Sequence, residues 1–249
     1  MVESKFTLEE QMMARAISNA TKARPRCMPN PWVGAVLVSS DGQTFDGFTQ
    51  EFGSGHAETV CLNEAGRKAQ GATLYVTLEP CSHSGKTGPC VERIIECRIS
   101  RVVIGMKDPD RQVCGEGIKS LQNAGVDVVV GVLEDLVADQ LAPYVHHRNT
   151  GRPYVILKIA TTLDGKVAAP DGSSQWITGP EARREGHKLR AYSDAICVGR
   201  GTVISDNPQL TVRDWSADDD IDKNLDPRRI VLGLSLIHIS EPTRRTPIS

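Results

Sequence analysis

The 249-residue sequence has no long apolar run and no marked excess of charge of either sign. Apolar stretches such as Val126–Val132 are short, whereas a membrane-spanning helix needs about 20 apolar residues, so we expect no transmembrane segment. The 29 basic and 31 acidic residues give a net charge of −2 without a basic block. Non-specific attraction to nucleic acid or to a membrane surface is therefore not expected.

Paired cysteines are not expected either. The seven cysteines are an odd number, and the first residues lack the basic flank and apolar segment of a secretory signal. A disulfide framework is rare under these conditions. We therefore expect a soluble, cytoplasmic protein.

The length predicts one or two domains, and the first part of the chain alternates between strand and helix patterns. Thr7 and Glu10 form a capping-box pattern at the start of a helix. Asp41-Gly42 between two apolar runs indicates a β-hairpin. The predicted strands are Gly34–Val38, Thr44–Phe48, Ala72–Leu78, Arg101–Gly105 and Val126–Val132, and the predicted helices are His56–Arg67, Cys90–Cys97, Gly117–Ala124 and Asp135–Tyr144. This order predicts an α/β layer fold with a largely parallel second half.

A linker is predicted over His146–Pro153, followed by a second unit. That unit has one long predicted helix, Pro180–Tyr192, whose proline fits the first helical turn. Its predicted strands are Tyr154–Ala160, Ala195–Gly199 and Arg229–Leu232. Because so few elements do not complete a doubly wound domain, the second unit is predicted to be incomplete.

Three residues have the types and order of a catalytic zinc site: His56, Cys81 and Cys90. One imidazole and two thiolates leave a fourth position for water, whose pKa the metal would lower to about 7. Glu58 is placed to move a proton between the resulting hydroxide and a leaving amine. The pattern is that of zinc nucleobase deaminases, except that eight residues separate the two cysteines.

Other interpretations of these residues are open. A non-catalytic zinc scaffold would not need Glu58 beside the metal. A nucleic-acid deaminase, such as a tRNA adenosine deaminase, would need a basic groove and the short cysteine spacing. His83 is either a fourth ligand or a loop residue facing substrate or solvent. The remaining cysteines are interpreted as small apolar residues: Cys27, Cys61, Cys97, Cys114 and Cys197.

The same stretches resemble the bifunctional riboflavin-biosynthesis deaminase/reductase family. The resemblance lies in His56-Ala57-Glu58, Gly71–His83, Asn30–Gly34, Leu163–Lys166, Ser174–Thr178 and Asp206-Asn207-Pro208. It covers nearly all of residues 7–232. It implies a cytidine-deaminase-like three-layer α/β/α domain followed by an incomplete dihydrofolate-reductase-like α/β domain.

The resemblance also implies an activity. This is zinc-dependent hydrolytic deamination of 2,5-diamino-6-(5-phosphoribosylamino)pyrimidin-4-one, followed by NADPH-dependent reduction of the ribosyl group to ribityl. The implied partner is this small molecule, with no nucleic acid and no membrane, and assembly into a homo-oligomer is left open. Substrate-binding residues on the deaminase side would be Asn30, His83, Lys86 and Asp108.

One position near the implied phosphate departs from the family pattern. Asp110 stands where the family usually has asparagine. A carboxylate there would repel a phosphate, and the neighbouring Arg111 could offset this repulsion. The alternative is that residues 108–111 form a solvated turn.

On the reductase side, the resemblance implies two further groups of residues. Those facing the NADPH cofactor would be Ala160, Trp176, Thr202 and Asp206, and those facing the substrate would be Ser174, Arg190, Leu210 and Arg213. Arginine suits bidentate pairing with phosphate. Gly199–Thr202 is a weak candidate for a phosphate loop. The alternatives are a core position for Trp176 and a surface charge for Arg190.

The predicted domains are a zinc-dependent deaminase over 1–147, the N-terminal part of a reductase over 148–234, and a tail over 235–249. The tail matches nothing in the family, and Pro242 and Pro247 argue against ordered structure. We interpret it as foreign read-through or a frameshift, similar to translated adapter sequence. A natural divergent terminus is the alternative. We therefore expect a truncated reductase with little or no NADPH reduction.

Overall fold

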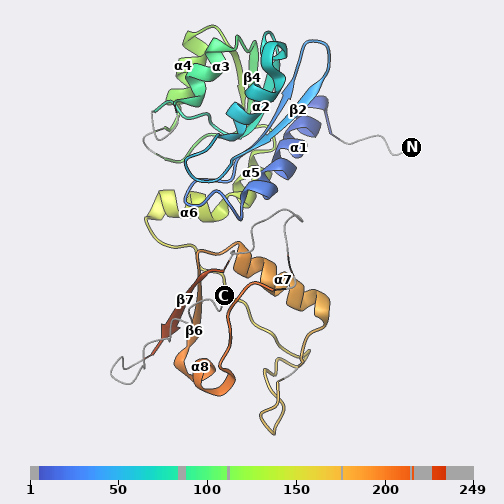
Figure 1. Cartoon of the computed structure of the whole chain (residues 1–249), viewed down its shortest axis with the longest axis vertical. Helices are drawn as coiled ribbons and strands as arrows, with labels where there is room; N and C mark the ends of the chain where they lie inside the picture. The colour runs from blue at the N-terminus through green and yellow to red at the C-terminus, as the bar shows by residue number, and fades with distance from the viewer. Residues whose placement is uncertain are drawn as a thin grey trace, which may run out of the picture. The chain divides into compact units, whose positions relative to one another are not determined.

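A five-stranded mixed sheet organises the first part of the chain (Figure 1). The computed structural model describes residues 6–83, 88–110, 113–174, 176–213, 215 and 226–233. It divides into two units, Met1–Ile156 and Leu157–Ser249. The predicted tail over 235–249 lies outside the described residues. The predicted domain limits at residues 147 and 234 stay a prediction.

The strand order in the first sheet is β2-β1-β3-β4-β5. Its strands are β1 (Gly34–Val38), β2 (Thr44–Phe48), β3 (Thr73–Leu78), β4 (Arg101–Met106) and β5 (Asp127–Val130). β1 runs antiparallel to β2 and β3, and β3, β4 and β5 are parallel to one another. The predicted hairpin and parallel half are confirmed, although β5 is shorter than predicted and exposed at both its ends.

Helices cover both faces of this sheet. They are α1 (Leu8–Ala23), α2 (Ala57–Ala65), α3 (Cys90–Glu96), α4 (Glu116–Asn123), α5 (Glu134–Gln140) and α6 (Ala142–Thr150), with a short 3₁₀ helix at Gly66–Ala69. α1 packs on β1, β2 and β3, and begins with the predicted capping box of Thr7 and Glu10. α2 packs on β1 and β2 and contacts α3, which in turn contacts α4.

Alternate residues of the strands supply the two cores. On one face of the sheet, Met13 of α1 clusters with Val36 and Tyr75. On the other face, Leu62 of α2 clusters with Leu37 and Leu74. This alternation is the two-residue period of a β-sheet that is buried on both faces. Three layers result, as predicted.

Gly47 allows α2 to lie directly against β2. A Cβ atom at this position would lie 2.3 Å from the carbonyl oxygen of Ala57 and 2.6 Å from Sγ of Cys61. Only glycine therefore permits this approach without a shift of the helix. The close packing fixes the first turn of α2, immediately after His56.

The predicted linker is partly wrong. α6 continues through most of it and ends at Thr150, followed by the cap residue Gly151, whose φ of 68° is in the left-handed region. Pro143 does not prevent this helix because proline fits the first turn, where its missing N–H has no helical partner. Within the described residues, no helix is long and apolar enough to cross a membrane.

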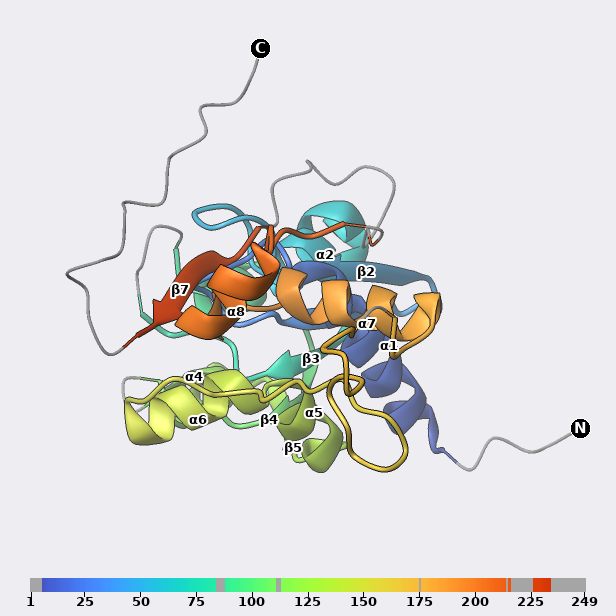
Figure 2. The ribbon, with the colours of Figure 1, turned by 90° about the horizontal axis from the view of Figure 1, so that it is seen from below.

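The second unit contains α7 (Pro180–Ala191), β6 (Ala195–Gly199), α8 (Arg200–Asp206) and β7 (Arg228–Leu232). β6 and β7 form a parallel pair (Figure 1), and α8 packs against both. Figure 2 shows α8 beside β7. The candidate phosphate loop at Gly199–Thr202 lies at the start of α8, where Gly199 is the N-cap and the helix begins at Arg200. Its role stays a prediction.

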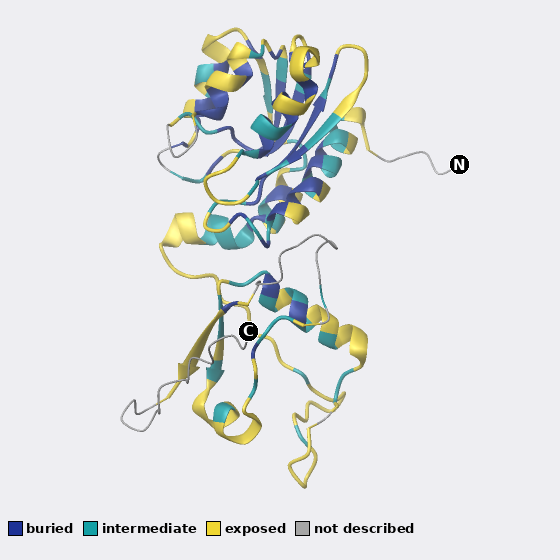
Figure 3. Ribbon diagram, viewed as in Figure 1, coloured by how far each residue is buried: buried dark blue, intermediate teal, exposed yellow. Residues whose placement is uncertain are grey.

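The predicted strand Tyr154–Ala160 is also wrong, since all seven residues lie outside any strand. A strand needs a hydrogen-bonded neighbour, and the described part of the second sheet pairs β6 only with β7. Val155 is 81% exposed and Leu157 is 82% exposed. Figure 3 shows that exposure prevails in the second unit, whose buried described residues are His187, Ala191, Leu210 and Pro227.

Candidate metal centre

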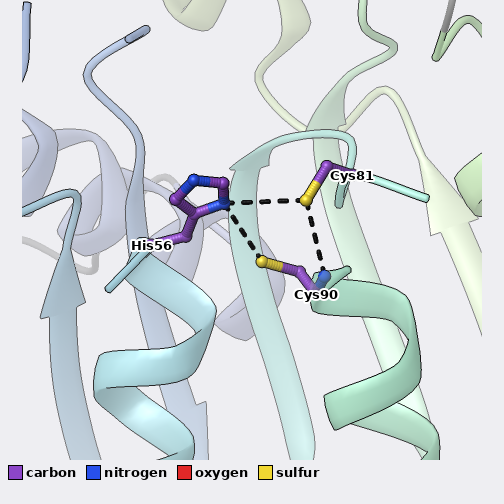
Figure 4. Close-up of side chains that lie close together, drawn as sticks. All are labelled: His56, Cys81 and Cys90. Atoms are coloured by element: carbon purple, nitrogen blue, oxygen red, sulfur yellow. Dashed lines mark hydrogen bonds between the residues drawn. The ribbon is translucent and has the colours of Figure 1, made fainter. Parts of the chain in front are cut away.

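Three elements of the first unit bring the predicted metal ligands together (Figure 4). His56 caps the start of α2, Cys81 follows β3, and Cys90 is the first residue of α3. Nδ1 of His56 lies 3.6 Å from Sγ of Cys81 and 3.3 Å from Sγ of Cys90. All three donor atoms lie within 4.8 Å of one another.

These separations fit a tetrahedral zinc ion. Zn–N and Zn–S bonds of about 2.0 and 2.3 Å place neighbouring donor atoms about 3.5–3.8 Å apart. A nitrogen and two sulfur atoms are also donors that zinc prefers over magnesium or calcium. The residues present therefore fit Zn²⁺.

Hydrogen bonding prepares Cys81 as a thiolate. The thiol of Cys90 is the main cause of a lowered pKa of Cys81, and the His56 ring adds to it. The backbone N–H of Cys90 also donates to Sγ of Cys81 over 3.4 Å. The hydrogen bond with Cys81, together with burial, raises the pKa of Cys90. A cation bound between the two sulfur atoms would stabilise both cysteines as thiolates.

Glu58 lies in the first turn of α2 and is 4% exposed. Burial raises the pKa of its carboxyl group, and the nearby Cys81 raises it further. Glu58 is not among the three grouped donors, but it lines the same cavity as His56 and Cys81. A carboxyl group in this position can hold and release a proton next to the metal.

The cavity measures about 150 Å³ and includes predicted substrate-binding residues. Asn30, His83 and Asp108 all line it. Lys86 lies outside the described residues. The structure therefore places three of the four deaminase-side residues beside the ligand triad, and their roles stay a prediction.

Glu79 shapes the cavity and was not singled out by the sequence. Its carboxylate is buried and accepts four backbone N–H bonds, of 3.0–3.2 Å, from Asp108, Gly115, Gly117 and Ile118. It thus joins the strand leading to Cys81 to the loop that carries Asp108. In the sequence, Glu79 could have been noticed as an acidic residue between an apolar strand and Pro80-Cys81.

Two residues of α6 also line the cavity without having been predicted. The hydroxyl of Tyr144 donates to Oδ1 of Asp108 over 3.0 Å, and Nη1 of Arg148 lies 3.3 Å from Oδ2 of Asp110. Burial raises the pKa of Asp108. Arg148 gave no signal because it falls in the segment that the sequence predicts to be a linker.

The second unit holds the residues predicted for the reductase. Arg190 of α7 donates from Nη1 to the carbonyl oxygen of Thr211 over 3.0 Å, and the backbone N–H of Arg213 donates to Nδ1 of His187 over 2.9 Å. The structure thus gathers Arg190, the buried Leu210 and Arg213 beside α7.

The other predicted reductase residues are more dispersed. Thr202 and Asp206 are exposed and lie one turn apart on α8, and Ala160 and Ser174 lie in the segment between α6 and α7, outside any helix or strand. Trp176 is 70% exposed under the guanidinium of Arg183, which rules out the alternative that it is a core anchor. The roles of these residues stay predictions.

Comparison with known proteins gives two family matches. Residues 7–106 match the cytidine and deoxycytidylate deaminase zinc-binding region, which here includes the three predicted ligands and Glu58. Residues 153–239 match the RibD C-terminal domain. The chain is a RibD homologue. The expected cytidine-deaminase-like domain followed by a dihydrofolate-reductase-like domain is confirmed. The second match continues to residue 239, beyond the predicted start of the tail.

Individual RibD proteins are similar to this chain over most of its length. The Escherichia coli K12 riboflavin biosynthesis protein RibD is 43% identical over 240 residues, which are 96% of this chain and 65% of the relative. RibD of Aquifex aeolicus is 45% identical over 206 residues, which are 83% of this chain and 58% of the relative. The chain thus spans about three fifths of the length of these RibD proteins.

Solved structures of RibD proteins are similar in fold. The Thermotoga maritima diaminohydroxyphosphoribosylaminopyrimidine deaminase/5-amino-6-(5-phosphoribosylamino)uracil reductase has a TM-score of 0.82 at 42% identity, over 90% of this chain and 63% of that one. Acinetobacter baumannii RibD has a TM-score of 0.81 at 41% identity, over 90% and 62% of the respective chains.

Proposed function

We propose that the first unit catalyses zinc-dependent hydrolytic deamination of 2,5-diamino-6-(5-phosphoribosylamino)pyrimidin-4-one in riboflavin biosynthesis. The observation that carries this proposal is the meeting of one imidazole and two thiol groups within 4.8 Å, with the buried Glu58 in the same cavity. The name of the similar Thermotoga maritima enzyme supports the substrate.

His56, Cys81 and Cys90 would hold the zinc ion. When bound, Zn²⁺ supplies a Lewis acid that lets a water molecule lose its proton near neutral pH. Glu58 would accept this proton and deliver it to the amino group that leaves as ammonia. The exocyclic C–N bond breaks, a C–O bond forms, and the ring gains a carbonyl group. Burial of Glu58 keeps the proton from bulk water during the transfer.

Polar groups of the cavity would orient the pyrimidine ring. Asn30 and Asp108 line the cavity with hydrogen-bonding groups of both kinds. A ring that left these groups unmatched would bind poorly, because buried polar groups without partners cost free energy. The cost of unmatched polar groups would thus favour one heterocycle over another.

For the second unit we propose part of a reductase that uses NADPH to reduce the ribosyl group to ribityl. Support comes from the match of residues 153–239 to the RibD C-terminal domain. Arg190 and Arg213, gathered beside α7, would bind the phosphate of the reductase substrate. The limits of the two domains, 1–147 and 148–234, are part of the same proposal.

The proposal includes a cytoplasmic location. All seven cysteines are free, which agrees with a reducing compartment. Association into a homo-oligomer stays a prediction, which sedimentation of the purified chain would test.

The decisive experiment measures ammonia release by the zinc-loaded full chain and its Glu58→Gln variant. Glutamine keeps the size of the side chain but cannot carry the proton, so we expect turnover to fall by about 10²–10⁴-fold while zinc content stays constant. Glu92→Gln, an exposed change on α3, serves as the control. Undiminished turnover by Glu58→Gln, or none by the parent chain, would overturn the proposal.

A further inference from the structure

The cavity beside the predicted metal ligands is rich in carboxylates, and the basic side chains among its described lining residues are His56, His83 and Arg148. Among its described lining residues, Glu58, Glu79, Asp108 and Asp110 are acidic, and Arg148 is the one arginine or lysine. A negatively charged ligand group can enter such a cavity only where a cation offsets the repulsion. Arg148 is therefore the side chain to consider for any anionic part of a substrate.

Two neighbours hold the Arg148 guanidinium at the cavity. Its Nη1 atom lies 3.3 Å from Oδ2 of Asp110, and its central carbon lies 5.1 Å from the ring centre of Tyr144. Tyr144 and Arg148 are four residues apart on α6, so their side chains share one face of the helix. Tyr144 is in turn fixed by its hydrogen bond to Asp108.

The other carboxylates of the wall already have partners of their own. Glu79 accepts four backbone N–H bonds, and Asp108 accepts from the Tyr144 hydroxyl and from the backbone N–H of Asp110. Arg148 of α6, which is distant in the sequence, forms an ion pair with Asp110. The neighbouring Arg111, to which the sequence pointed, lies outside the described residues.

An arginine held in this way can still bind an anion. Guanidinium has five N–H donors in a planar fork, so an arginine that contacts Asp110 through Nη1 can also donate to an anion. The side chain of Arg148 is 39% exposed, so a ligand can reach it. Phosphate accepts two parallel hydrogen bonds from such a fork.

We propose that Arg148 is a specificity-determining residue that binds the phosphate of the substrate's ribosyl arm, and that Asp110 positions it. The inference rests on the proposed function, because that reaction supplies a substrate with a phosphoribosyl group. It assigns to α6 the choice between phosphorylated and unphosphorylated substrates, while the metal ligands and Glu58 carry out the chemistry.

The first test measures binding by calorimetry with ribose 5-phosphate, and with ribose as the uncharged comparison. The proteins are the zinc-loaded full chain, Arg148→Met and the matched control Arg152→Met, which changes an exposed arginine beyond the end of α6. We expect Arg148→Met to weaken ribose 5-phosphate binding about tenfold or more, as the loss of charge-assisted hydrogen bonds implies. Affinity within twofold of the parent would overturn the proposal.

The second test measures ammonia release from the phosphorylated substrate and from its unphosphorylated counterpart. Arg148→Met should raise KM for the phosphorylated substrate about tenfold with kcat within twofold, and leave kcat/KM for the unphosphorylated one unchanged. Arg148→Lys, which keeps the charge but loses the fork, should give an intermediate KM. If Arg148→Met does not fold, the Arg148→Lys comparison decides: an unchanged KM would overturn the proposal.

The two proposals fail in different ways. Ammonia release that is insensitive to Arg148, in KM and in ribose 5-phosphate affinity, overturns the role of Arg148 and leaves the deaminase intact. Ribose 5-phosphate binding that depends on Arg148, without ammonia release by any variant, supports the phosphate site and overturns the proposed reaction.

Discussion

The carboxylate of Glu79 satisfies four backbone N–H groups at once, two through each oxygen. At the scale of single residues, this carboxylate ties one side chain of the cavity wall to four backbone positions. It carries no part of the proposed chemistry, yet it sets where Asp108 lies relative to Cys81. Its contribution is therefore positional.

We predict that Glu79→Gln lowers the free energy of unfolding by about 2 kcal/mol, because an amide group cannot accept at both ends and leaves buried N–H groups without partners. KM should rise more than kcat falls, since Asp108 shifts while the metal ligands stay. Urea denaturation and steady-state kinetics measure the two effects. If Glu79→Gln were as stable as the exposed variant Glu92→Gln, this prediction would be wrong.

Residue type and spacing were enough to single out the side chains that the structure brings together at His56. Histidine, cysteine and an adjacent acid are rare enough in this order to be informative. Tyr144 and Arg148 could not be found in the same way, because their position depends on how α6 packs beside the loop of Asp108. No local pattern encodes that packing.

At the scale of elements, α2 delivers His56 to the site because Gly47 lets the helix contact β2. We predict that Gly47→Ala lowers the free energy of unfolding by about 1–3 kcal/mol, since the added methyl group would overlap the Ala57 carbonyl oxygen. Zinc affinity should fall as the first turn of α2 moves. Denaturation and zinc titration test both effects.

Gly55→Ala is the matched control for this change. Its Cβ atom would lie 3.6 Å from the nearest atom, a Val60 methyl group, which is an ordinary contact. Gly55 is also nearer to His56 in the sequence. Equal losses of zinc affinity in both variants would contradict the role assigned to Gly47.

A second link between elements joins α1 to β2. Nε of Arg15 donates to Oδ1 of Asp46 over 2.8 Å, and Asn19 donates to the same atom over 2.6 Å. Burial acts to raise the pKa of Asp46, but these two partners outweigh it, and the pKa is lowered.

A lowered pKa in the folded state means that ionised Asp46 stabilises the fold above its unfolded pKa of about 3.9. We predict that the stability difference between the parent and Asp46→Asn is full at pH 7 and shrinks as the pH falls through the folded pKa. Denaturation curves at several pH values measure this difference. A difference that stayed constant down to pH 2 would contradict the prediction.

Most strands and helices could be predicted because local patterns decide them. The hairpin around Asp41-Gly42 and the capping box of Thr7 are examples. Tyr154–Ala160 was predicted wrongly. Its apolar residues are typical of a buried strand, but a strand forms only where a hydrogen-bonded neighbour from elsewhere in the chain is present. α8 was missed because its glycine-containing start suggested a loop.

At the scale of the whole molecule, the two units differ in how many of their described side chains are buried. Few described side chains of the second unit are buried, and the predicted cofactor-facing residues Trp176, Thr202 and Asp206 are exposed. We predict that the full chain releases ammonia but shows little or no NADPH oxidation with the deaminated product. The absorbance of NADPH provides the assay, and sustained oxidation would contradict the prediction.

The exposed apolar segment Tyr154–Ala160 has a practical consequence. Proteases that cleave after large apolar residues need accessible side chains on a backbone outside helices and strands, which Val155 and Leu157 offer. Limited digestion should therefore cut here first and release a fragment that retains every described lining residue of the metal-side cavity, from Asn30 to Arg148. One nick at this point would cut the chain between the two units, without any redesign of the gene.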